Sequence, residues 1–192
     1  MSKIHQNGGI SASSNQVPQK QVSGKKTETG ADGKQFTKGA VIEAFCVADG
    51  KLIPISEVQD DVFSEKMLGD GYAIVPTGNT IYTPVAGTVA CIFPTKHALG
   101  IQTVSGLEVL LHMGIDTVEL KGAPFHIHVK EGQLLKQGDK VATVDLVALS
   151  QAGKKSDIIV AFTNQEIVDD FHLDKISQTV SANEKIGQIT LK

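Results

Sequence analysis

The side chains best suited to chemistry in this chain are two histidines, His97 and His112. Each lies in an apolar, strand-like segment, IFPTKHALGIQT or GLEVLLHMGIDTVEL. Imidazole changes charge near neutral pH, and its two ring nitrogens can be used separately, one held by a hydrogen bond while the other attacks or ligates. As a pair they fit a structural role and group-transfer chemistry about equally well, so the wider sequence pattern is needed to distinguish the two roles.

Apolar and polar residues around His112 alternate as in a strand that has one buried and one exposed face. On an extended strand every second side chain shares a face. The more apolar set, which we expect to face the core, is Val109, Leu111 and Met113. His112 is then predicted on the outer face, with Leu110 beside it.

The charged residues restrict the chemistry further. All 18 basic residues are lysine, and the net charge is −3. Arginine clamps on phosphate are therefore unavailable within the chain, and phosphoryl chemistry would rely on histidine, backbone N–H groups or a partner's arginine. The acidic balance also argues against a nucleic-acid surface.

The elements that must position these side chains are predicted to be short strands. β-Branched segments bounded by Gly, Pro, Asp or Asn recur along the chain: AVIEAFCVA, KLIPI, YAIVP, NTIYTP, GTVACIF, LEVLLHM, KVATVDL and DIIVAF. With 19 glycines and no tryptophan, this pattern predicts an all-β fold, an antiparallel sandwich or barrel-like arrangement.

Helix is expected only in short pieces. Asp145 can cap a helix over residues 146–151, with Gly153 as its stop. Asn164 can cap a second helix over residues 165–171, and residues 58–67 can add one turn.

The chain divides into a polar N-terminal segment and an acidic body. Residues 1–39 are rich in Lys, Ser, Gln and Gly and show no apolar periodicity, so we predict a disordered tail or tether. Residues 40–192 are predicted to form one folded domain, whose excess of acidic residues suits a basic partner. An initiating methionine followed by a tail favours a free-standing protein.

The cysteines and the hydropathy bear on location. Cys46 and Cys91 stand singly in apolar runs, and both are predicted to be buried free thiols in a reducing compartment. The sequence has no apolar run of about 18 residues and no export signal. We therefore expect a cytoplasmic protein that does not itself span a membrane.

Several motifs together point to one family. The segments SEVQDDVFSEKMLGDGYAIVPTGN, TPVAGTV, IFPTKHALGIQT, GLEVLLHMGIDTVELKG and EGQLLKQGDKVATVDL occur in the order and spacing of that family. From about Ile42 onward the chain resembles the glucose-type enzyme IIA of the bacterial phosphoenolpyruvate-dependent sugar phosphotransferase system. The resemblance implies a β-sandwich built as a duplicated hybrid motif, with no resident cofactor.

The resemblance also implies roles for particular residues. His112 matches the phosphorylated histidine and His97 its partner across a shallow site. Thr95 and the backbone carbonyl of Gly114 match the groups that orient the two rings.

The implied docking surface surrounds these histidines. Its residues match an apolar collar and an acidic rim: Phe63, Phe93 and Leu110, with Asp60 and Asp116. The implied partners are the histidine phosphocarrier protein, which gives phosphate, and a cysteine of the IIB domain of a membrane sugar permease, which accepts it. We expect the collar, including Phe63, to be exposed.

Two other functions stay open. The chain could be a regulatory binding module whose docking to permeases or kinases is switched by phosphorylation of His112. It could also be a zinc hydrolase with His97 and His112 as ligands, although catalytic zinc normally needs three protein ligands, so a partner would have to complete the set. His126 and His128 have the spacing for an adventitious metal contact, but we expect them to be plain exposed strand residues.

Overall fold

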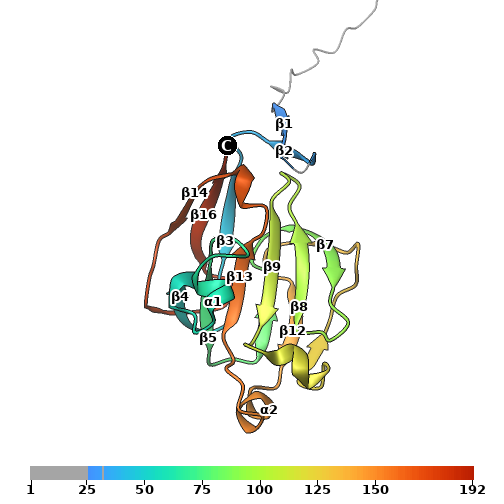
Figure 1. Ribbon diagram of the computed structural model, residues 1–192, viewed down its shortest axis with the longest axis vertical. Helices are drawn as coiled ribbons and strands as arrows, with labels where there is room; N and C mark the ends of the chain where they lie inside the picture. Colours follow the sequence, from blue (N-terminus) through green and yellow to red (C-terminus); the bar gives the residue numbers. More distant parts are fainter. Residues whose placement is uncertain (1–25, 32) are drawn as a thin grey trace, which may run out of the picture.

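The computed structural model describes residues 26–31 and 33–192, and they form antiparallel sheets with short helices (Figure 1). The largest sheet has eight strands in the order β11-β7-β8-β9-β13-β5-β4-β15. Its strands are β4 (Gly50–Pro54), β5 (Gly71–Pro76), β7 (Gly87–Ile92), β8 (Ala98–Gln102), β9 (Glu108–Met113), β11 (Leu134–Leu135), β13 (Ile158–Phe162) and β15 (Thr179–Val180).

Two three-stranded sheets complete the domain. One has the order β10-β12-β6 and the other β14-β16-β3. Their strands are β3 (Val41–Phe45), β6 (Thr80–Tyr82), β10 (Phe125–Ile127), β12 (Lys140–Val144), β14 (Val168–Leu173) and β16 (Lys185–Leu191). The antiparallel sandwich predicted from the strand pattern is confirmed.

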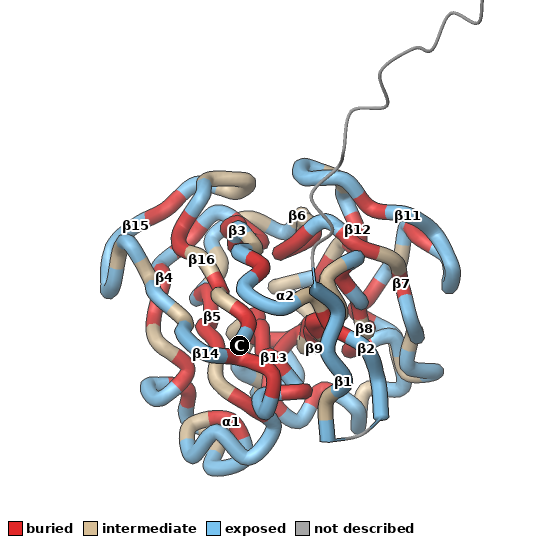
Figure 2. The backbone as a smooth tube through the Cα atoms, turned by 90° about the horizontal axis from the view of Figure 1, so that it is seen from above, coloured by how far each residue is buried: buried red, intermediate tan, exposed pale blue. Residues whose placement is uncertain are grey.

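The main core lies between the eight-stranded sheet and the small sheets. Figure 2 shows the buried segments gathered in the middle of the molecule. Inward-facing residues such as Leu111 of β9, Val144 of β12 and Ile189 of β16 belong to one buried cluster. Strands whose apolar residues alternate in this way bury one face and leave the other for function.

A second, smaller cluster lies on the opposite face of the large sheet. It is built from β4, β5 and β13 together with η1 (Ile55–Glu57) and α1 (Asp61–Ser64), which covers it. Its buried members are Ile53, Ile55, Val58, Phe63, Ala73, Ile115, Ile159 and Ala161, with Leu110 packed against them. The helical turn expected within residues 58–67 is therefore present, and it forms one wall beside β9.

The helix α2 (Leu146–Gln151) begins and ends as predicted. Oδ1 of Asp145 accepts from the Ala148 N–H at 2.9 Å, and Gly153 has a φ of +69°. A left-handed residue after the last turn is the usual position for glycine.

The second predicted helix is wrong beyond its first turn. Only η3 (Gln165–Ile167) is helical, and β14 follows it, paired with β16. The Asn164 side chain does not cap this turn, because Oδ1 accepts from the Glu108 N–H at 2.8 Å and Nδ2 donates to the Gly106 carbonyl at 2.9 Å. Strand pairing over residues 168–173 outweighs the weak helix signal.

The prediction of a disordered tail over residues 1–39 is wrong for its described part. Strands β1 (Thr27–Thr29) and β2 (Gln35–Thr37) form a hairpin, seen above the large sheet in Figure 1. Phe36 is only 6% exposed and joins the main core, so one aromatic side chain anchors an otherwise polar segment. Residues 1–25 and 32 lie outside the described residues.

A short 3-10 helix, η2 (Thr117–Leu120), follows β9.

None of the helices within the described ranges has the length and apolar character that a membrane span requires.

Candidate functional site

The β8–β9 hairpin brings the two histidines together. His97 directly precedes β8, and Ala98 pairs with His112 in the register of the two strands. The Met113 N–H donates to the His97 carbonyl at 2.7 Å. As a result the two ring centroids lie 5.0 Å apart, with an interplanar angle of 79°.

The alternation predicted for β9 is confirmed. Val109, Leu111 and Met113 are buried, while Leu110 and His112 are partly exposed on the other face. The face that carries His112 is the one beside α1 and the second apolar cluster, where the Phe63 ring lies 5.0 Å from the His112 ring.

A backbone carbonyl fixes the tautomer of His112. Nδ1 lies 2.8 Å from the Gly114 oxygen, and because a carbonyl only accepts, Nδ1 must carry the proton. In the neutral ring the lone pair then resides on Nε2.

The turn that presents this carbonyl requires glycine. Gly114 has a φ of +79°, and a Cβ there would lie 2.4 Å from Cγ2 of Thr117. The Thr117 hydroxyl, in turn, donates to the Met113 carbonyl at 2.5 Å. The bond to His112 therefore depends on a tightly packed turn that a side chain at position 114 would displace.

The His97 ring is oriented by neighbours of its own, Thr95 and Phe93. The residue is 7% exposed, and Nδ1 lies 2.6 Å from the Thr95 hydroxyl. The Phe93 ring meets it edge-on at 5.5 Å.

Both histidines are shifted toward the neutral form. Burial lowers the pKa of His112 to about 4, and the nearby His97 adds to this, while the hydrogen bond to Gly114 and the Asp60 and Asp116 carboxylates oppose it. Burial also lowers the pKa of His97. At neutral pH both rings are therefore uncharged, and Nε2 of His112 keeps its lone pair.

A groove of about 810 Å³ includes both rings. Besides the histidines, it is lined mainly by apolar and small side chains of α1, β7, β8, β9, η2 and the loops that adjoin them, including Val62, Leu68, Ala90, Phe93, Leu110 and Val118. The arrangement offers a fixed nucleophile, a neighbouring imidazole and an apolar surface on which a second molecule can exclude water.

Comparison with known proteins places this arrangement in a family. Residues 42–168 match the family described as phosphoenolpyruvate-dependent sugar phosphotransferase system, EIIA 1. The chain belongs to this family. It is thus a phosphoryl carrier component of the sugar phosphotransferase system, and the family resemblance noted in the sequence is confirmed.

The relatives with similar sequences are also components of this system. The chain is 46% identical over 129 residues to the glucose-specific EIIA component of Mycoplasma capricolum, covering 67% of this chain and 82% of that protein. It is 45% identical over 149 residues to the glucose-specific EIICBA component of Streptococcus pneumoniae, covering 78% of this chain but 20% of that protein. The chain therefore spans about a fifth of this longer relative.

A solved structure shares the fold. The glucose permease IIA from Mycoplasma capricolum superposes with a TM-score of 0.71 at 39% sequence identity. The match covers 78% of this chain and 96% of that one.

The residues predicted for the docking surface, Phe63 included, line the groove, but Phe63 is less exposed than predicted. Phe93, Leu110, Asp60 and Asp116 all line it, and Asp60 also caps α1 by accepting from the Phe63 N–H at 3.3 Å. Phe63 is only 5% exposed and packs within the second cluster. The expectation of an exposed Phe63 is wrong, because α1 turns this ring inward against the sheet.

Three exposed apolar residues of the groove were not predicted from the sequence. Val62, Leu68 and Val118 are 41%, 39% and 50% exposed. Each stands beside a residue that was predicted for the site or in the same motif, so the available signal was an apolar residue in an otherwise polar turn.

The two cysteines differ in exposure. Cys46 is buried, as predicted; its thiol donates to the Ala48 carbonyl at 2.9 Å, and burial raises its pKa to about 11. Cys91 is exposed and lines the groove, so its predicted burial is wrong. A bulge between Val89 and Cys91 in the β7–β8 pairing accompanies this change of face.

Metal ligands are sparse around both histidine pairs. Among the described residues, no three His, Cys, Asp or Glu side chains gather so that they could hold a metal ion. A zinc ion on His97 and His112 would need further ligands from another molecule. His126 and His128 are both exposed, as predicted.

Proposed function

We propose that Nε2 of His112 accepts the phosphoryl group that this EIIA chain carries. The observation that supports this most directly is the hydrogen bond from Nδ1–H of His112 to the Gly114 carbonyl. It leaves Nε2 as the nucleophilic nitrogen. When the N–P bond forms, the ring becomes positively charged with Nδ1–H retained, and the same carbonyl stabilises that charge.

His97 is proposed to stabilise the group in transit. With the Thr95 hydroxyl donating to Nδ1 of His97, the ring proton lies on Nε2 and can be given to a phosphoryl oxygen. Transfer between two nitrogen atoms needs little more than in-line positioning and stabilisation of charge on the equatorial oxygens. His97 makes no covalent bond in this scheme.

The donor is proposed to be the histidine phosphocarrier protein, and the acceptor a cysteine of a sugar permease's IIB domain. In the first step the N–P bond of the donor's phosphohistidine breaks as the bond to His112 forms; in the second, a thiolate displaces His112. Two relatives are named as EIICBA components for glucose and glucosamine, from Streptococcus pneumoniae and Bacillus subtilis, which supports a IIB partner. The carboxylates of Asp60 and Asp116 at the groove favour a basic donor surface that supplies the missing arginine.

Free cysteines support a reducing setting for this reaction. Cys46 and Cys91 are both unpaired, and disulfides are rare in the cytosol. We place the transfer in the cytoplasm, on the side where a soluble donor can meet the permease domain.

Incubation with phosphoenolpyruvate, enzyme I and the phosphocarrier protein tests the proposal. Intact mass should rise by one phosphate that is labile in acid and stable in alkali, and peptide mapping under alkaline conditions should place it on the peptide that contains His112. No mass gain, or a phosphate that survives acid, would contradict it.

A further inference from the structure

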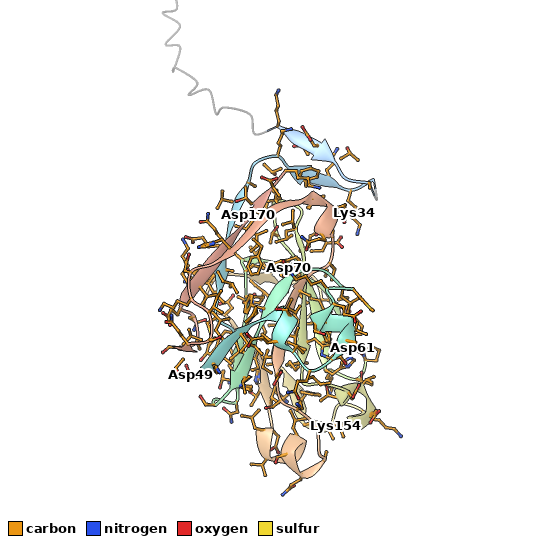
Figure 3. The ribbon with its side chains drawn as sticks, turned by 60° about the vertical axis from the view of Figure 1, so that its left-hand side comes forward. Lys34, Asp49, Asp61, Asp70, Lys154 and Asp170 are labelled. Carbon is orange, nitrogen blue, oxygen red and sulfur yellow. The ribbon has the colours of Figure 1, made fainter. Side chains whose placement is uncertain are left out.

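The β1–β2 hairpin lies outside residues 42–168, which match the EIIA family, yet it reaches the groove. Lys34, just before β2, is among the lining residues, and so is Glu108 at the start of β9. Figure 3 labels Lys34 at the side of the hairpin that adjoins the rest of the domain. The hairpin therefore contributes a residue from outside the matched region to one end of the site.

The hairpin is fixed against the turn between β8 and β9. Besides the burial of Phe36, the Thr37 N–H donates to the Ser105 carbonyl at 2.9 Å. The contact is close at Gly106, where a Cβ would lie 2.6 Å from the Gln35 carbonyl oxygen. The position of Lys34 relative to the groove is thus set by packing and backbone bonds.

Lys34 forms an ion pair with Glu108. Glu108 and His112 are the first and the fifth residue of β9, so roughly 13 Å of strand separate them at about 3.3 Å per residue. A lysine held at Glu108 does not reach a phosphoryl group on His112. Its influence must fall on the molecule that docks, not on the reacting atoms.

We propose that Lys34 weakens docking of a basic donor by occupying Glu108. This inference rests on the proposed function, in which a basic surface of the phosphocarrier protein covers the groove. Three carboxylates line the groove, those of Asp60, Glu108 and Asp116. Lys34 neutralises one of them from within the chain, so only two are left to attract the donor.

The expected size of this effect is modest. The side chains of Lys34 and Glu108 are 57% and 28% exposed, and exposed ion pairs are screened by water and salt. Release of Glu108 should therefore tighten donor docking by about 2- to 5-fold at low salt.

Four variants test the assignment through the KM for the phosphorylated phosphocarrier protein at low and high ionic strength. Lys34→Gln should lower KM about 2- to 5-fold at low salt, and Glu108→Gln should raise it. The double variant should return close to the wild-type value. Lys38→Gln is the matched control, since Lys38 carries the same charge on the same hairpin but pairs with Glu28; its KM should stay near wild type.

The opposite signs separate this role from a purely structural one. If the pair only held the hairpin in place, Lys34→Gln and Glu108→Gln would both raise KM, and both would lower the melting temperature. A raised or unchanged KM for Lys34→Gln at low salt would overturn the inference, as would an equal fall in Lys38→Gln. Wild-type protein that accepts no phosphate would instead contradict the proposed function itself.

Discussion

Two pairs of histidines in this EIIA chain have similar spacing and different surroundings. The ring centroids of His97 and His112 lie 5.0 Å apart, and those of His126 and His128 lie 4.6 Å apart. The first pair is recessed in an apolar groove, and one of its rings donates to a carbonyl. The second pair lies on the exposed face of β10 and just beyond it.

On the proposed function, two neighbouring imidazoles are not sufficient for a transfer site. Nε2 of His128 lies 2.7 Å from the Thr143 hydroxyl, a group that can donate or accept and so does not fix the ring's tautomer. The Gly114 carbonyl can only accept, and burial keeps His112 neutral. We attribute nucleophilic character to this acceptor and this burial, which His126 and His128 both lack.

The largest contrast is expected from substituting one histidine of each pair. His112→Gln should accept no phosphate in the reconstituted system, because in the proposed scheme only His112 forms a bond to phosphorus, whereas His126→Gln should be labelled at the wild-type rate. Intact mass over a time course measures both. Label on His112→Gln, or its loss in His126→Gln, would break the distinction between the pairs.

Within the recessed pair, His97→Gln should slow transfer without abolishing it. Glutamine retains a neutral N–H donor, and loss of one well-placed donor to a transition state typically costs about 10² to 10³ in rate. Rapid quench should show both phosphorylation and onward donation slowed, with the label still on His112. If His97→Gln is never labelled and His112→Gln is, the two roles are reversed.

Gly114→Ala tests the turn that supplies the carbonyl. The added Cβ meets Thr117 in a left-handed backbone conformation, so the free energy of unfolding should fall by about 2–4 kcal/mol, and transfer should slow. Gly153→Ala is the matched control: its φ is +69° but its Cβ would meet nothing within 4 Å, so about 1 kcal/mol is expected. Equal losses in denaturant titrations would mean that the turn is not tightly packed.

The pH dependence of stability should also report on the burial of His112. The pKa of His112 falls from 6.5 to about 4 on folding, so the unfolded chain binds the proton more tightly. Stability present above pH 6.5 is then lost as pH falls from about 6.5 to 4, by on the order of 2 kcal/mol, since the ring is partly exposed and screened. His112→Gln should flatten this profile; a profile identical to that of the wild type would count against a buried neutral His112.

The smallest effect concerns the exposed apolar residues of the groove. Val118→Ser should raise the KM for the phosphocarrier protein by a few fold, roughly one lost apolar contact, without lowering the melting temperature. Val147→Ser, on exposed α2 outside the groove, is the control. An equal change in both variants would show that the groove is not where the donor docks.

The outward face of His112 could be predicted from the alternation along β9. The roles of Thr95, His97 and Gly114 were implied by the family resemblance of two short motifs, which one hairpin joins in the structure. The start and the end of α2 could likewise be predicted from Asp145 and Gly153.

The rest depends on tertiary packing that no local pattern contains. Phe63 faces inward because α1 closes over the second cluster, and the strand β14 exists because β16 pairs with it. The anchoring of the β1–β2 hairpin by Phe36 depends on a site formed by distant residues. Composition alone therefore assigned that segment to a disordered tail.

Nitrogen-15 NMR of the histidine rings, before and after phosphorylation, tests the central claim most directly. In the free protein the ring of His112 should be the neutral tautomer with the proton on Nδ1, held by the Gly114 carbonyl. After transfer the phosphorus coupling should appear on Nε2 of His112, with Nδ1 still protonated. Phosphorus coupled to Nδ1, or to either nitrogen of His97, would contradict the account.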